Sequence, residues 1–280
     1  MRHPENIRGI AAVLAWLLAE ISKCLGQKIC STVLYGSATL GDFCPRWSDV
    51  DVCVVLETPI TPEEGQSIGN VHDRLRERFI SEGCESWESG QAVEGSYVPV
   101  ELVTDEKLEM PCYTAGGSTR KWAVCHPISP FDRYMLAHFG HLLSGVAAPF
   151  TPPCRQSLVS QAETDLSVLR TWNHSEQSAI WLAGMLHWAA RSLVFWRDGK
   201  MLSKSAALEH EIAHGSPFST AFQLALAIRR EGSRTAADHH AELKRHFSPV
   251  AVDLAQEIDT NMKAERGAQP GDTDNASRRT

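Results

Sequence analysis

Two aspartates separated by one residue, Asp49 and Asp51, follow a Gly-Ser pair, Gly36 and Ser37, in the segment VLYGSATLGDFCPRWSDVDVCVVLE. Side chains alternate along a strand, so the two carboxylates point to the same face. Magnesium ions in proteins prefer a few carboxylates together with phosphate oxygens. A glycine lets the backbone approach phosphates closely, and a serine offers a hydroxyl and an N–H. The spacing therefore predicts Asp49 and Asp51 as metal ligands, and Gly36 and Ser37 as contacts to a nucleotide triphosphate.

A third acidic residue, Glu101, lies in the apolar run YVPVELV, which we predict to be a strand over residues 97–103. A buried carboxylate without a partner is costly. If this strand neighbours the one that carries Asp51, the three acids converge, and Glu101 is the candidate base for an acceptor hydroxyl. The alternative is an exposed charge on the open face of an edge strand.

Two cations are candidates for binding phosphate. Arg191 lies late in an apolar helix predicted over 176–197, where a positive charge calls for an anionic partner. Gly199 ends that helix and Ser203 can cap the next, which places Lys204 in a first helical turn. A lysine there opposes the helix dipole unless an anion lies beside it. We therefore predict Arg191 and Lys204 as a pair of phosphate ligands.

The elements that must position these residues change character along the chain. The first part reads as helix, strand, strand, helix, strand, with predicted bounds 5–25, 29–35, 50–56, 61–81 and 97–103. The rest reads as helices only, over 130–145, 155–172, 176–197, 203–213, 217–231 and 234–263. This order predicts an α+β fold. Its parts are a mixed sheet with helices over 1–125, an all-helical domain over 126–264, and a disordered tail over 265–280.

Composition narrows the class of function. The 280 residues carry a formal net charge of −7, which argues against a primary nucleic-acid binder. Eight cysteines without a C-x-x-C pair indicate reduced, mostly buried thiols. The apolar run from Ile10 to Leu18 is too short to span a bilayer and lacks a signal-peptide cleavage site. We therefore expect a cytoplasmic monomer that binds neither membrane nor nucleic acid.

Taken together, these motifs resemble the aminoglycoside (3'')(9) adenylyltransferases, the streptomycin and spectinomycin resistance enzymes. They belong to the DNA polymerase β-like nucleotidyltransferase superfamily. The family pattern of G-S, S-D-x-D, a strand glutamate and an R-x12-K element falls on Gly36 and Ser37, Asp49 and Asp51, Glu101, and Arg191 with Lys204. The resemblance implies an N-terminal nucleotidyltransferase domain with a C-terminal helical domain. It also implies transfer of AMP from Mg-ATP to a hydroxyl of an aminoglycoside or aminocyclitol antibiotic, and hence antibiotic resistance.

The acceptor is less sharply indicated. Trp181 stands where streptomycin-modifying members of the family have an aspartate, which favours a spectinomycin-like acceptor over streptomycin. Adenylylation of a protein or of an unrelated metabolite, or a non-catalytic interaction protein on the same fold, remain alternatives. The segment from His210 to His214 matches the zinc-binding pattern H-E-x-x-H. A metzincin would need glycine and histidine at Pro217 and Thr220, so the sequence disfavours a zinc protease.

Overall fold

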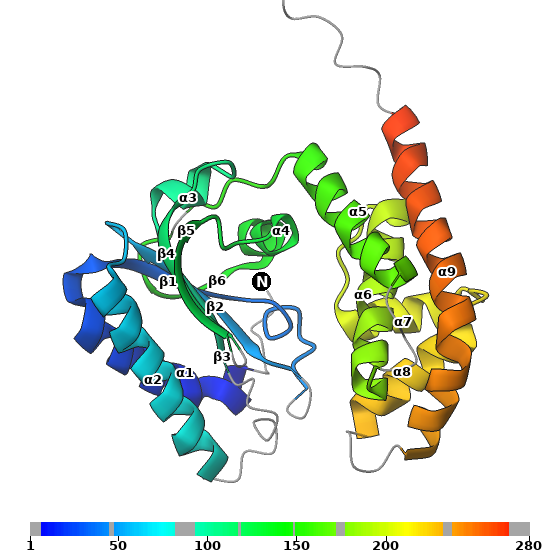
Figure 1. Cartoon of the computed structure of the whole chain (residues 1–280), viewed down its shortest axis with the longest axis horizontal. Coiled ribbons are helices and arrows are strands. Elements are labelled where there is room, and N and C mark those ends of the chain that lie inside the picture. The colour runs from blue at the N-terminus through cyan, green and yellow to red at the C-terminus, as the bar shows by residue number, and fades with distance from the viewer. Residues whose placement is uncertain are drawn as a thin grey trace, which may run out of the picture. The chain divides into compact units, whose positions relative to one another are not determined.

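A computed structural model describes residues 7–44, 48–81, 93–116, 119–147, 149–171, 177–231 and 237–268. The chain divides into two compact units, Met1–Gln161 and Ala162–Thr280 (Figure 1). The first holds a sheet with helices and the second holds helices. The α+β class predicted from the sequence is confirmed.

The first unit is built on a mixed sheet. Among the described residues it has six strands in the order β5-β4-β3-β2-β1-β6. Their bounds are β1 Ile29–Tyr35, β2 Val50–Leu56, β3 Val93–Pro99, β4 Met110–Gly116, β5 Thr119–Cys125 and β6 His141–Gly145. The pair β2–β3 is parallel and the other pairs are antiparallel. β1 and β2 occupy the ranges predicted for them, as expected for runs rich in β-branched residues.

Two helices cover one face of this sheet. α1 (Ile7–Leu25) and α2 (Pro62–Ser81) lie on the same side in Figure 1, with α4 (Pro130–Phe139) on the other. Leu34, Val52 and Val54 of the strands belong to a single core cluster with the apolar side chains of α1 and α2. Side chains alternate between faces, so Tyr35 and Asp51 point to the opposite face. The helices thus leave that face available for polar side chains.

The sequence of α1 was predicted to be too short to span a membrane. The segment Ile10–Lys28 is long and apolar enough to cross a membrane by length and composition, so the prediction that it is too short is wrong. However, Ile10, Leu17 and Ile21 are at most 1% exposed and pack in the core against the sheet. The apolar face of this helix is therefore used in folding the first unit.

The third predicted strand is misplaced. The strand ends at Pro99 rather than running over 97–103, and Glu101 begins the short helix α3 (Glu101–Thr104). Proline has no N–H to donate to a neighbouring strand, which is why it sits at a strand end. After it, the Val100 N–H still donates to the Leu56 carbonyl at 2.8 Å. β4 and β5, which follow α3, were not expected.

The predicted helix over 130–145 is wrong in its second half. α4 ends before Gly140, where a Cβ would lie 2.5 Å from the carbonyl oxygen of Leu136. The chain then continues as β6, which pairs with β1. Both α4 and β6 belong to the first compact unit, which extends to Gln161.

The later helices agree with the sequence pattern. They are α5 Arg155–Thr171, α6 Ala179–Asp198, α7 Lys204–Ala213, α8 Ser219–Glu231 and α9 Ala237–Ala268. Gly199 ends α6 in the left-handed region at φ +66°, and the Ser203 side chain accepts from Ala206 N to cap α7. α6 packs against α7, α8 and α9. Residues 265–268 are helical, contrary to the predicted tail, and 269–280 lie outside the described residues.

Candidate active site

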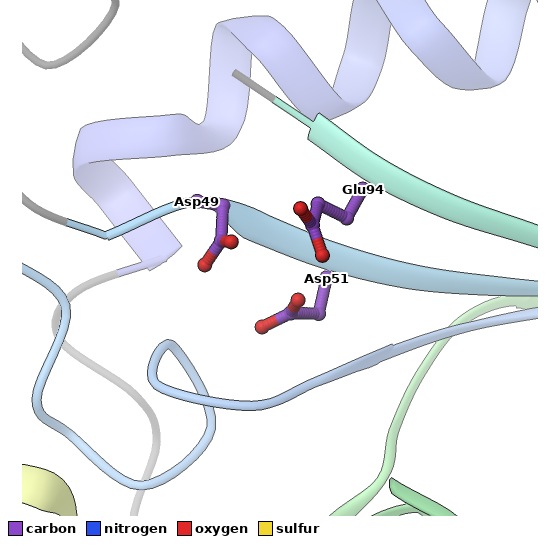
Figure 2. Close-up of side chains that lie close together, drawn as sticks. All are labelled: Asp49, Asp51 and Glu94. Carbon is purple, nitrogen blue, oxygen red and sulfur yellow. The ribbon is translucent and has the colours of Figure 1, made fainter. Parts of the chain in front are cut away.

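Three carboxylates converge on the open face of the sheet. Asp49, Asp51 and Glu94 each offer an oxygen within 4.8 Å of the others, and each side chain is half-buried. Asp51 on β2 and Glu94 on β3 are direct neighbours in the parallel register, and Asp49 precedes Asp51 by two residues on the same face. Figure 2 shows the three side chains gathered around one point. Hard oxygen donors arranged in this way suit a divalent cation such as Mg²⁺.

The structure brings the two predicted aspartates together, but the glutamate that lies beside them is Glu94 and not the predicted Glu101. Glu101 is exposed on α3, beyond the end of the β2–β3 pair where Leu56 pairs with Pro99. The prediction that Glu101 joins the aspartates mid-strand is therefore wrong. The sequence did contain a signal for Glu94. Val93, Gly95 and Tyr97 alternate with Glu94 and Ser96, the pattern of a half-buried strand.

The Gly-Ser pair packs directly against this cluster. Gly36 has φ +74°, and a Cβ at this position would lie 1.9 Å from Oδ2 of Asp51. Backbone bonds from Leu40 N to Gly36 O (3.3 Å) and from Asp42 N to Ser37 O (3.0 Å) form the turn after β1. The buried hydroxyl of Ser37 makes no hydrogen bond within the described part of the chain. A turn of this kind, with an unused hydroxyl beside the carboxylates, is suited to bind phosphate oxygens.

A tyrosine extends the row of polar side chains across the sheet. Tyr35 on β1 pairs with Asp51 and is 8% exposed. Burial raises the pKa of Tyr35 well above its usual range, and the nearby charges of Asp132, Asp51 and Glu94 act in the same direction. The phenol is therefore protonated at neutral pH and can donate a hydrogen bond. Neither Tyr35 nor Asp132 was singled out from the sequence.

A pocket of about 280 Å³ lies beside Glu94. Its walls come from β1, β3, β4 and the start of α4, and they include Tyr35, Glu94, Ser96, Thr114 and Asp132. The pocket lies entirely within the first unit. It therefore offers a polar compartment next to the three carboxylates.

In the helical unit, the structure brings the two predicted cations near one buried histidine. His187 is fully buried, and burial lowers its pKa to about 3, with further lowering by Arg229, Lys204 and Arg191. Arg229 is 2% exposed, and its Nε donates to the Ser205 hydroxyl at 3.1 Å. Three cations thus lie close enough to His187 to act on its pKa, one of them missed from the sequence. A role in phosphate binding remains a prediction.

The H-E-x-x-H segment serves in packing. Glu211 is 1% exposed and accepts from Arg197 Nη2 at 2.6 Å, an ion pair that joins α6 and α7. The rings of His210 and His214 stack at 4.1 Å, and Nδ1 of His214 donates to the His210 carbonyl at 2.7 Å. Within the described ranges, these histidines belong to no group of three side chains placed to hold a metal.

Comparisons with known proteins add information on the fold. No protein-family model matches the sequence. No curated protein matches it either. The structure is similar to that of spectinomycin adenyltransferase AAD(9) from Enterococcus faecialis, solved with ATP and spectinomycin. The TM-score is 0.65 at 12% sequence identity, and the match covers 89% of this chain and 99% of that one. At this identity the likeness concerns architecture, and it shows that the chain has the α+β fold of a nucleotidyltransferase.

Proposed function

We propose that this protein is a nucleotidyltransferase that moves AMP from Mg-ATP to a hydroxyl of a small cationic acceptor. The observation that carries the proposal is the convergence of Asp49, Asp51 and Glu94 on one face, with the Gly36 turn packed against Asp51. The fold neighbour was solved with ATP and spectinomycin, which supports the same pair of substrate classes here.

The metal site fits the residues that are present. Like charges so close together disfavour one another, and a divalent cation would offset their repulsion. Asp49 and Asp51 are the ligands we assign to Mg²⁺. A bound Mg²⁺ would neutralise part of the negative charge on the triphosphate and hold the triphosphate in a fixed orientation.

Phosphate binding is assigned to four further residues. Gly36 allows the backbone to approach the triphosphate closely, and the Ser37 hydroxyl has the unused capacity to bind a phosphate oxygen. Arg191 and Lys204 are proposed as cationic ligands from the helical unit. Charge-assisted bonds from such groups to phosphate are about twice as strong as neutral ones.

Glu94 is the residue we assign as general base. Its carboxylate takes the proton of the acceptor hydroxyl as the acceptor oxygen forms a bond to the α-phosphorus. The bond from the α-phosphorus to the bridging oxygen breaks, and pyrophosphate leaves with that electron pair. The products are the adenylylated acceptor and pyrophosphate.

For the acceptor, we propose an aminocyclitol or aminoglycoside antibiotic, with spectinomycin-like molecules ahead of streptomycin. Trp181, in the first turn of α6, cannot pair with the guanidinium groups of streptomycin as a carboxylate would. Spectinomycin has no guanidinium and loses less by this substitution. The corresponding physiological role is antibiotic resistance.

The test is pyrophosphate release from Mg-ATP with a panel of aminocyclitols, aminoglycosides and sugar alcohols. Glu94→Gln should lower kcat by about 10²–10⁴-fold, the usual contribution of a general base. Glu101→Gln is the matched control, because it makes the same change on an exposed side chain at the other end of the strand pair. It should leave turnover unchanged.

Three outcomes would each contradict a part of the proposal. If Glu101→Gln removes turnover while Glu94→Gln does not, the assignment of the base is wrong. If no acceptor in the panel releases pyrophosphate although the protein binds Mg-ATP, the small-molecule acceptor is wrong. Turnover of streptomycin without turnover of spectinomycin would reverse the ranking.

A further inference from the structure

The pocket beside Glu94 has a composition that points to a particular ligand. We propose that it is the acceptor subsite, in which Asp132 and Tyr35 recognise a protonated amine adjacent to the reacting hydroxyl. The inference rests on the proposed function and goes beyond it by naming where the acceptor lies and which group selects it. All the residues of this pocket lie in the first unit.

Tyr35 supplies the first argument. Its side chain is more than nine-tenths buried and lines the pocket. The ring is buried while the hydroxyl can take a hydrogen-bond partner from the pocket. A ligand hydroxyl or amine in the pocket would supply that partner.

Asp132 supplies the charge. It lies in the first turn of α4, where Ser129 caps the helix by accepting from the Asp132 N–H at 3.1 Å. The Ser129 hydroxyl also donates to Oδ2 of Asp132 at 2.7 Å, which fixes the carboxylate. Asp132 and Tyr35 line the same pocket, so a ligand held there can reach both side chains. A fixed carboxylate in a polar pocket is suited to a cationic group.

The remaining walls fit a small polyhydroxylated ring. Ser96 and Thr114 add side-chain hydroxyls that can both donate and accept. Gly116 keeps the wall open beside the base, because a Cβ there would lie 3.1 Å from the carboxyl carbon of Glu94. A volume of about 280 Å³ is enough to admit an aminocyclitol ring. The ligand class is therefore a ring that carries an ammonium group next to a hydroxyl.

The experiment measures acceptor binding separately from turnover. Protein loaded with Mg²⁺ and a non-hydrolysable ATP analogue is titrated calorimetrically with spectinomycin, 2-deoxystreptamine and the neutral ring myo-inositol. Asp132→Asn keeps the bonds to Ser129 and removes the charge. It should weaken binding of the amines by about 10- to 100-fold, as expected for loss of a charged hydrogen bond. Tyr35→Phe should weaken it by about 3- to 10-fold. Asp105→Asn, on an exposed aspartate whose bond to Lys107 N asparagine can also make, is the matched control.

The binding measurements either support or overturn the assignment of the pocket as the acceptor subsite. The proposal stands if Asp132→Asn loses amine affinity while its affinity for the nucleotide and its apparent Tm match those of Asp105→Asn. It is overturned if Asp132→Asn binds the amines as the wild type does, or if myo-inositol binds as tightly as they do. It is also overturned if neither amine binds to protein that binds the nucleotide. Failure of the wild type to bind Mg-nucleotide at all would instead contradict the proposed function.

Discussion

Replacing Gly36 by alanine is the sharpest test of the site geometry. The residue has φ +74°, and the added Cβ would lie 1.9 Å from Oδ2 and 2.8 Å from the carboxyl carbon of Asp51. Real Cβ atoms essentially never approach closer than 3.0 Å, so the carboxylate or the turn must move by at least about 1 Å. The substitution therefore acts on Asp51 without changing its charge.

The substitution should affect both the stability of the fold and the rate of the reaction, by different amounts. A non-glycine residue in the left-handed region costs about 1–2 kcal/mol of stability. Displacement of a catalytic group by about 1 Å can cost about 10²-fold in rate. We therefore expect Gly36→Ala to lower both the apparent Tm and the kcat for pyrophosphate release, with the larger relative loss in kcat.

Gly41→Ala separates the two effects. Gly41 follows in the same segment at φ +70°, and a Cβ there meets nothing within 4 Å. It carries the conformational cost alone, so its apparent Tm should fall while its kcat stays near that of the wild type. If the two alanine variants have the same turnover per folded molecule, the contact between Gly36 and Asp51 does not set the geometry of the metal site.

Three further predictions concern other parts of the molecule. Arg191→Gln and Lys204→Gln should each raise the KM for ATP about 10-fold, whereas Arg230→Gln, on an exposed ion pair with Glu209, should not; equal KM values in steady-state assays would contradict this. Arg133→Met should lower the free energy of urea unfolding by about 3–5 kcal/mol, because the buried guanidinium binds several carbonyls, including Val103 O at 2.8 Å. His72, whose pKa burial lowers to about 4, takes up a proton near pH 6.5 on unfolding. Stability should therefore be full above about pH 6.5 and fall toward pH 4, and His72→Gln should reduce that fall in a series of Tm measurements.

The sequence predicted well wherever a single local pattern determined the structure. β1 and β2 are continuous apolar, β-branched runs, so their bounds could be read directly. The D-x-D spacing placed Asp49 and Asp51 on one face, and the structure agrees. Gly199 and Ser203 fixed the junction of α6 and α7 because each has one favourable position at a helix end.

The errors arose where a stronger local signal lay beside the true one. The run after Tyr97 is more apolar than the segment around Glu94. The strand was therefore predicted too late in the chain, at a position that included Glu101. Only the register between β2 and β3, which is a tertiary property, shows that Glu94 is the neighbour of Asp51. The residues of the pocket could not be predicted from the sequence for the same reason. Tyr35 and Asp132 are distant in sequence and come together only when α4 packs over the sheet.

If the proposed function is correct, the parallel register of β2 and β3 makes the amount of folded protein depend on the concentration of Mg-nucleotide. Because Asp51 and Glu94 are direct neighbours, backbone hydrogen bonds between the strands hold two like charges together before any ligand arrives. The proposed Mg-nucleotide ligand would bind the folded chain and not the unfolded one, so its concentration would add to the stability of the fold. We expect resistance to proteolysis to rise with Mg-nucleotide, and Glu94→Gln to gain part of that resistance without ligand. Selection for a longer-lived protein and selection for an active one therefore oppose each other at this pair of residues.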